Sequence, residues 1–238
     1  MKRVGVIGRG RIAGPVIEAI RNNGDWQLAG VLARNPSREF ELQADAFFDR
    51  DYDLIIEAAG PEALHEHAIR ALAMADLWTV SGSVLADDGF RQAVERAGAQ
   101  SGHRLRLLSG SMAGLDGVAA QAAGGASRLE IINQRPGLGK QAGTVFSGSL
   151  RDAAGLYPDE VNAAVAVALA GPGINATTMT LVDPGPGGEH RLMLKGDGGF
   201  ATLDVDILIR PLSLGHLHPV AASIIAALKD ATRPIRIG

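Results

Sequence analysis

A glycine-rich turn directly follows the first apolar segment and constrains the fold of this chain more than any other feature. Val4–Ile7 is typical of a buried strand, and it runs into Gly8-Arg9-Gly10-Arg11-Ile12-Ala13-Gly14, with a helix expected to begin near Arg11. A Gly-x-Gly-x-x-Gly/Ala pattern between a strand and a helix indicates dinucleotide binding. An ordinary strand–turn–helix connection is the alternative interpretation.

The small residues of this turn each meet a requirement of dinucleotide binding. Gly8 permits the tight turn, Gly10 lets backbone amides approach a pyrophosphate, and Ala13 lets the helix pack closely on the strand. The diphosphate then lies at the positive end of the helix dipole. The residues expected to contact the cofactor here are Gly8, Gly10, Arg11, Ile12 and Ala13.

Length and composition indicate a globular α/β enzyme with two unequal domains. The chain has 238 residues, which is near the size at which one core divides into two, and 46% of them are hydrophobic. It contains no cysteine, so disulfides, thiolate metal sites and cysteine nucleophiles are excluded. This composition fits a reducing cytoplasm.

Charge and hydropathy argue against two classes of partner. The net charge of −3 and the scattered arginines provide no basic surface for nucleic acid. No apolar run reaches the roughly 20 residues that a membrane-spanning helix needs, and the sequence starts with a strand instead of a signal peptide. We therefore expect a cytoplasmic protein that binds neither nucleic acid nor membrane.

Apolar strands alternate with helical segments over residues 1–110. This alternation predicts a doubly wound parallel sheet that forms a dinucleotide-binding domain, with the nucleotide at the carboxyl ends of the strands. The predicted strands cover Arg3–Ile7, Gln27–Leu32, Leu54–Ala58, Trp78–Val80 and Arg104–Leu108, and the predicted helices cover Arg11–Asn22, Ala63–Ala73 and Phe90–Gln100.

The pattern changes after Ser111 and predicts a second, smaller α+β domain over residues 111–212, for substrate binding and dimerisation. Consecutive strands without intervening helices favour an antiparallel sheet with one face on helices and one face free for a subunit contact. Residues 213–238 are expected to pack back on the first domain. The predicted strands are Leu129–Asn133, Thr144–Ser147, Thr177–Val182, Glu189–Leu194 and Ala201–Ile209, and the predicted helices are Met112–Gly124, Asp159–Leu169 and His218–Leu228.

The end of the second strand bears on cofactor choice. An acidic residue there binds the ribose of NAD, whereas a nearby arginine accommodates the 2′-phosphate of NADP. The sequence has Ala33 followed by Arg34, so no carboxylate opposes the phosphate and Arg34 can bind it. The alternative is that Arg34 is a solvated loop residue.

Five of the six histidines fall into three settings. His65 and His67 lie near a helix start at a spacing that points them to different sides, and His216 and His218 lack a carboxylate cluster nearby, so no metal site is expected. His190 begins a strand of the second domain after a Gly-Pro turn. An imidazole there is a candidate for proton transfer, and a turn histidine is the alternative.

The order of motifs resembles the L-aspartate dehydrogenase family. That resemblance implies a Rossmann domain with a small substrate domain, oxidation of aspartate to iminosuccinate with NAD or NADP, and release of oxaloacetate and ammonia or supply of NAD biosynthesis. The matching segments are Gly8–Gly14, Glu57–Gly60, Ser81–Asp88, Ser109–Gly117, Phe146–Ala153 and Tyr157–Ala164.

The resemblance also assigns candidate site residues. The family's proton-transfer histidine follows an Asp-Pro turn, which places it at His190 after Asp183-Pro184. Its cofactor contacts correspond to Ser111 and Asn162, with Ala59 in the Glu57–Gly60 motif beside them. A helix cap for Ser111 and a capping or turn role for Asn162 are the alternatives.

One segment departs from the family pattern. A Pro-Lys-Thr-Ser run is usual before the last helix, whereas this chain has Pro211–His218 without lysine. A dicarboxylate needs cationic or amide partners, and the remaining candidates are Arg135, Lys140, His216 and His218. A related reductase for another small amino acid or imine, and a catalytically silent nucleotide-binding sensor, are therefore the competing hypotheses.

Overall fold

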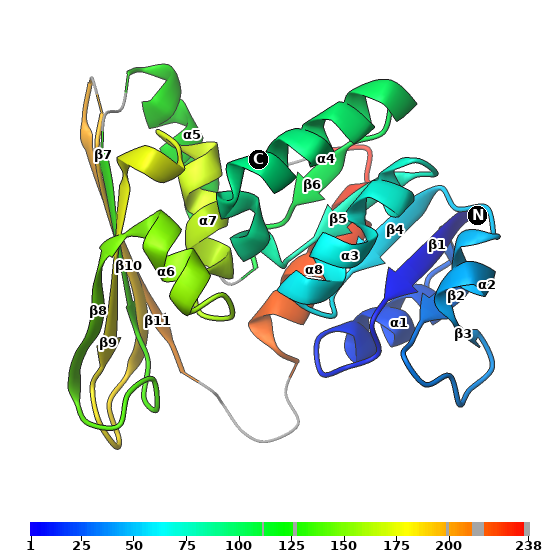
Figure 1. Cartoon of the computed structure of the whole chain (residues 1–238), viewed down its shortest axis with the longest axis horizontal. Helices are drawn as coiled ribbons and strands as arrows, with labels where there is room; N and C mark the ends of the chain where they lie inside the picture. Colours follow the sequence, from blue (N-terminus) through cyan, green and yellow to red (C-terminus); the bar gives the residue numbers. More distant parts are fainter. Residues whose placement is uncertain (111, 126–127, 199, 211–216, 236–238) are drawn as a thin grey trace. The chain divides into compact units, whose positions relative to one another are not determined.

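The computed structural model describes residues 1–110, 112–125, 128–198, 200–210 and 217–235. The chain divides into two compact units (Figure 1). The first unit comprises Met1–Gly110 with the C-terminal segment Leu217–Gly238, and the second comprises Ser111–His216. Each unit is built around its own sheet.

The first unit is a Rossmann-type α/β domain, as the sequence predicts. Its six strands follow the order β3-β2-β1-β4-β5-β6 and all pair in parallel. The strands are β1 (Lys2–Ile7), β2 (Trp26–Leu32), β3 (Glu41–Leu42), β4 (Leu54–Glu57), β5 (Asp76–Thr79) and β6 (Leu105–Leu107). The α-helices are α1 (Ala13–Arg21), α2 (Ala44–Phe48), α3 (Pro61–Leu72), α4 (Asp88–Ser101) and α8 (Pro219–Asp230).

The C-terminal helix α8 belongs to the core of the first unit. Its Ala221, Ile224 and Leu228 are buried in the same cluster as the residues of β1 and α1. These three positions recur at helical spacing, so they form one apolar face. The indole nitrogen of Trp26 on β2 donates a hydrogen bond to the carbonyl oxygen of Leu228 at 3.2 Å, which fixes the end of the helix against the sheet.

The second unit pairs a five-stranded sheet with helices. The strands follow the order β11-β10-β7-β9-β8. The strands are β7 (Arg128–Gln134), β8 (Gly143–Ser149), β9 (Thr177–Asp183), β10 (His190–Asp197) and β11 (Thr202–Ile209), and the α-helices are α5 (Leu115–Ala123), α6 (Leu150–Leu156) and α7 (Asn162–Ala170). Short 3₁₀ helices cover Gly82–Ala86 in the first unit and Ile174–Ala176 in the second.

The expectation of a purely antiparallel second sheet is wrong, because β7 and β9 pair in parallel. The other ladders, β10 with β11, β10 with β7 and β8 with β9, are antiparallel. The chain between β7 and β9 contains β8, α6 and α7. A connection of that length lets the chain cross over and return in the same direction, which a short hairpin cannot do.

The two faces of the second sheet differ. Helices α5, α6 and α7 lie on one face (Figure 1), and the side chains that point toward them, such as Leu129, Ile131 and Leu194, are buried. The intervening residues of β7 and β10, such as Glu130 and Lys195, are exposed. This alternation matches the period of two in a strand covered on one side.

The boundaries of several elements differ from those predicted. Helix α1 begins at Ala13, two residues after the predicted start near Arg11, and Arg11 and Ile12 form a turn before it. The short elements β3, α2 and α6 were not predicted. Each of them has seven residues or fewer, which leaves little room for a periodic apolar pattern.

Candidate functional site

The glycine turn after β1 has the geometry that the sequence predicts. Gly8 has a φ of +106°, a conformation that side chains disfavour, and its amide bonds the carbonyl of Leu32 at 3.0 Å. A methyl group at Gly8 would lie 2.9 Å from Cβ of Ala59, which follows β4. Only glycine therefore allows the ends of β1 and β4 to approach each other here.

Gly10 and the start of α1 form a cradle that fits a diphosphate. Nothing lies within 4 Å of the position that a Cβ of Gly10 would occupy. The cap residue of α1, Ile12, provides no side-chain hydrogen bond to the first turn, so backbone N–H groups remain available to an anion. Ala13 is fully buried against the sheet, consistent with its predicted packing role.

A buried carboxylate, that of Glu57, fixes the loop opposite this turn. Glu57 ends β4 and is fully buried. Its Oε1 accepts hydrogen bonds from the amides of Ala59 and Gly60 at 2.6 and 2.8 Å, and its Oε2 accepts one from Oγ1 of Thr79 at 2.5 Å. Burial raises the pKa of Glu57, and these hydrogen bonds oppose that rise.

Arg34 lies beyond the end of β2 on the surface. Its side chain is 89% exposed, and its guanidinium lies 3.6 Å from the carboxylate of Glu62, which is 92% exposed. Such an exposed pair contributes at most about 1 kcal/mol and leaves the arginine able to exchange partners. Arg34 is thus a solvated loop residue whose guanidinium is accessible to a ligand.

The loop after β2 is organised by Glu41, which sequence reasoning missed. The Oε2 atom of Glu41 accepts hydrogen bonds from the amides of Ser37 and Arg38 at 2.7 and 3.1 Å and from the guanidinium of Arg9 at 2.9 Å. The amide of Ser37 is the main cause of a lowered pKa for Glu41. Arg9 from the glycine turn is thereby linked to the loop that carries Arg34.

His190 is the first residue of β10, as predicted, and is half-buried. It pairs with Ile209 of β11. Alternation along β10 places its side chain on the same face as the buried Leu192 and Leu194, which is the helix-covered face of the second sheet.

Two residues near the end of β7 are held by Glu160, which precedes α7. The side-chain amide of Asn133 donates to the backbone carbonyl of Glu160 at 3.1 Å. The guanidinium of Arg135 donates to both carboxylate oxygens of Glu160, through Nε at 3.1 Å and through Nη2. Asn133 is 4% exposed, and among the described residues its Oδ1 has no hydrogen-bond partner.

Asp183, at the end of β9, fixes the loop that carries Lys140. It is buried, and its two carboxylate oxygens accept hydrogen bonds from the amides of Gly139 at 2.9 Å and Gly185 at 2.8 Å. These backbone donors, Gly139 first, hold the pKa of Asp183 below its usual value. Lys140 itself is exposed.

The remaining candidates have identifiable contacts or lie outside the described residues. Asn162 begins α7 and donates a hydrogen bond to the carbonyl of Asp159 at 3.4 Å. His218 caps α8, with Nδ1 accepting from the amide of Val220 at 3.3 Å, and burial lowers its pKa. Ser111 and His216 lie outside the described residues, as do Pro211–His216 of the departing segment.

The histidines of α3 take structural positions. The ring of His65 packs on Phe90 with centroids 4.7 Å apart, and the ring of His67 packs on Phe48 at 5.7 Å. Across the described ranges, no group of three or more histidine, aspartate or glutamate side chains is placed to hold a metal ion. No described helix is long and apolar enough to cross a membrane.

The structure thus brings the predicted residues together within each unit. In the first unit, Gly8, Gly10 and Ala59 share the carboxyl edge of the sheet with the start of α1. In the second unit, His190 and Arg135 lie at adjacent strand ends. The sequence analysis did not predict that the carboxylates of Glu57 and Glu160 hold these residues in place. An acidic residue at the end of an apolar strand, as at Glu57, is a signal that could have indicated such a role.

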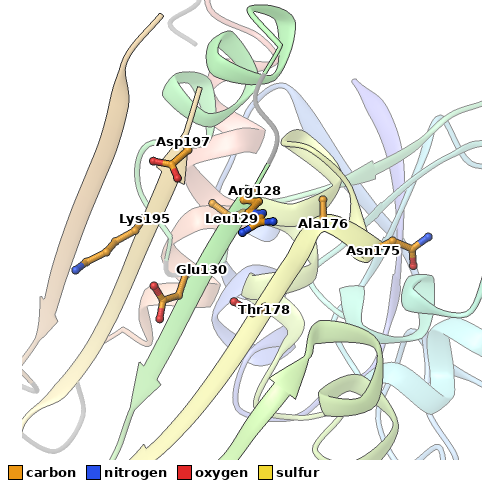
Figure 2. Close-up of a pocket in the computed structure, with 8 residues that line it drawn as sticks. All are labelled: Arg128, Leu129, Glu130, Asn175, Ala176, Thr178, Lys195 and Asp197. Carbon is orange, nitrogen blue, oxygen red and sulfur yellow. The ribbon is translucent and has the colours of Figure 1, made fainter. Parts of the chain in front are cut away.

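A pocket of about 540 Å³ in the second unit lies away from these residues (Figure 2). It includes Arg128, Glu130, Lys195 and Asp197, at the opposite end of β10 from His190. The strand rise places the two ends of β10 about 20 Å apart. Arg128 pairs with Asp197 and Glu130 with Lys195 across β7 and β10, so the pocket is a charged hollow in the sheet surface.

Comparisons with known proteins agree over both units. Residues 110–231 match the family model described as aspartate dehydrogenase, C-terminal, and residues 8–108 match that described as homoserine dehydrogenase, NAD binding domain. L-aspartate dehydrogenase of Ruegeria pomeroyi is 32% identical, with 98% of this chain and 94% of the relative covered. L-aspartate dehydrogenase 1 of Bordetella pertussis is 30% identical, with 96% and 94% covered. The crystal structure of aspartate dehydrogenase from Thermotoga maritima superimposes with a TM-score of 0.81 at 24% identity, covering both chains completely.

Replacement of Gly10 by alanine tests the cradle. The open space around Gly10 lets the protein accept a methyl group, so the melting temperature should stay within about 2 °C of that of the parent protein. Because the methyl group would stand where a phosphate approaches the backbone, affinity for NAD(P) should fall at least about tenfold. Calorimetric titration with each nucleotide measures this loss.

Gly14→Ala is the matched control for this experiment. Gly14 also has nothing within 4 Å, but it lies inside α1 and its amide is already bonded to Gly10. This variant should keep its nucleotide affinity. Equal affinity in the two variants would contradict the assignment of Gly10.

Proposed function

Because the chain belongs to the aspartate dehydrogenase family and is an NAD(P)-dependent amino-acid dehydrogenase, we propose that it oxidises L-aspartate to iminosuccinate. The observation that carries the proposal is a match over nearly the whole chain, which includes both the dinucleotide cradle of the first unit and His190 of the second. We assign substrate binding to the unit Ser111–His216.

Proton transfer at the substrate nitrogen is the task that we assign to His190. The bound nicotinamide supplies the acceptor for a hydride that leaves Cα with the electron pair of the broken C–H bond. Formation of the C=N bond also requires the amino group to lose a proton, and the neutral imidazole of His190 accepts it. The products are iminosuccinate, the reduced nucleotide and one proton on the base.

The fate of the imine follows from its chemistry. Addition of water to the C=N bond gives oxaloacetate and ammonia, and an intact imine can instead enter the biosynthesis of NAD.

The absence of cysteine supports action in the reducing cytoplasm. We propose that this chain contributes to the reaction by orienting the substrate, and that it supplies no redox group of its own.

His190→Ala tests the proton-transfer role. The substitution should lower kcat for aspartate oxidation by about 10²–10⁴-fold, because general acid–base assistance acts in the transition state. Cofactor affinity, measured by titration, should change less than about twofold, which also reports that the protein is folded. His65→Ala is a matched control, since His65 packs against Phe90 and has no proposed role.

Near-normal turnover of the His190→Ala variant would reduce His190 to a turn residue. Absence of aspartate turnover in the parent protein would instead contradict the substrate. In that case other small amino acids should be tested as substrates, because the Pro211–His218 segment differs from the family pattern.

We propose that NADP(H) binds at least as well as NAD(H). Ala33 replaces an acidic ribose ligand, and the exposed Arg34 is available for the 2′-phosphate. Its present partner, Glu62, carries a negative charge that a phosphate would have to displace. The two residues are therefore expected to act in opposite directions on NADP affinity.

Arg34→Ala should weaken NADP binding by about tenfold and leave NAD binding nearly unchanged, because only NADP carries the 2′-phosphate. Glu62→Gln should strengthen NADP binding by a few-fold, since it removes a repelling carboxylate. Titration of each variant with both nucleotides measures these differences. A preference of the parent protein for NAD above about tenfold, which is roughly 1.4 kcal/mol, would contradict the proposal.

We propose that the protein is a homodimer formed through the helix-free face of the second sheet. Ile132 and Met193 are paired neighbours on that face and are surrounded by opposite charges, including the Glu130–Lys195 pair. A surface with both signs of charge around an apolar centre can complement a second copy of itself around a twofold axis.

Light scattering at dilute concentration should give the mass of two chains, about twice 24.7 kDa. Met193→Asp should produce a monomer, because two carboxylates would be buried near the symmetry axis. Ile69→Asp is the control, since Ile69 is an exposed apolar residue of α3 in the first unit. A monodisperse parent monomer would rule out the dimer.

A further inference from the structure

The substrate that we propose carries two carboxylates, so the second unit should offer a cation near His190. Three candidates from the sequence are described in the structure: Arg135, Lys140 and His218. His218 serves as a helix cap, and its lowered pKa favours the neutral ring at pH 7, which makes it a poor partner for a carboxylate. The two candidates that lie in the second unit, Arg135 and Lys140, remain.

Strand register brings Arg135 and His190 to the same end of the ladder between β7 and β10. Gln134 of β7 pairs with Arg191 of β10 in an antiparallel ladder. The ladder ends at this pair, so Arg135 follows the last paired residue of β7 and His190 precedes the last paired residue of β10. Both residues thus lie at the same end of the ladder, and the alternation of side chains along each strand puts them on the same face. Lys140, in contrast, lies on an exposed loop five residues beyond Arg135.

Glu160 holds the Arg135 guanidinium in one orientation. It accepts from Nε and Nη2 of Arg135, and its own backbone is fixed by the amide of the buried Asn133. A guanidinium has five N–H donors, and within the described ranges no partner other than Glu160 is found for the guanidinium of Arg135. Its side chain is 39% exposed, so the unused donors can be reached.

One edge of the planar Arg135 guanidinium thus bonds Glu160, and among the described residues its other edge is free to bond a ligand. A lysine at this position would not be oriented in this way, because its ammonium is a point charge on a flexible stem. We propose that Arg135, oriented by Glu160, binds a carboxylate of the amino-acid substrate and makes the site selective for a dicarboxylate. This inference rests on the proposed function and adds a specificity residue to it.

The experiment compares substrates that differ by one charge. L-aspartate, L-asparagine and the α-amide of aspartate are titrated calorimetrically into protein saturated with NADPH, which cannot accept a hydride from the substrate. Loss of a charge-assisted hydrogen bond in Arg135→Gln should weaken aspartate binding by about 10- to 100-fold. One of the two amides lacks the carboxylate that Arg135 binds, and the affinity of the protein for that amide should fall less than about threefold in Arg135→Gln. Arg135→Lys should restore part of the affinity for aspartate.

Two further variants separate this role from a structural one. Arg128→Gln removes an arginine at the other end of β7 and should leave the binding of all three compounds unchanged. Glu160→Gln keeps the backbone carbonyl that Asn133 bonds and should reproduce the aspartate-selective loss on a smaller scale. Melting temperatures report whether each variant is folded.

Equal losses for all three compounds in Arg135→Gln would show a structural ion pair and overturn the inference while aspartate oxidation by the parent protein stands. No loss for any compound would overturn it as well. A parent protein that neither binds nor oxidises aspartate would overturn the proposed function and this role together.

Discussion

The carboxylate of Glu57 is the interaction on which the cofactor edge of the first unit depends. From the end of β4 it holds the amides of Ala59 and Gly60 on one oxygen and the hydroxyl of Thr79 on the other. A hydrogen bond within a protein contributes about 0.5–1.5 kcal/mol net, and loss of the acceptor would leave the buried hydroxyl of Thr79 unpaired. The backbone at Ala59 therefore stays against Gly8, and the glycine turn keeps the shape that a nucleotide requires.

Carboxylates fix two other loops in a similar way. Glu41 gathers the amides of Ser37 and Arg38, and Asp183 gathers those of Gly139 and Gly185. In both loops a carboxylate at one end of a strand, Glu41 of β3 or Asp183 of β9, supplies the acceptor for backbone amides. Because these contacts lower the pKa of Glu41 and Asp183, their stabilisation persists above the ordinary carboxyl pKa near 4 and is lost as the pH falls through the lowered values.

Local sequence patterns predicted most of the helices and strands. Features that depend on pairing between residues far apart in the sequence could not be predicted in this way. The apolar run before Gly8 and the start of a strand at His190 were visible in the sequence. The capping pattern of Ser149 and Asp152 could also have revealed α6, because the hydroxyl of Ser149 accepts from the amide of Asp152 at 3.1 Å. The parallel pairing of β7 with β9 depends on a crossover, and the contact of Arg135 with Glu160 joins residues 25 positions apart, so neither leaves a local pattern.

The position of α8 has a consequence for synthesis of the chain on the ribosome. Ala221, Ile224 and Leu228 complete a core whose other members, such as Val4 and Trp26, are translated some 200 residues earlier. The first unit begins to form first, but its apolar surface stays uncovered until the last helix emerges. The intervening unit, Ser111–His216, has all of its strands available before then. Vectorial translation thus favours completion of the second unit before the first, and exposes the nascent first unit to chaperones and to aggregation for longer.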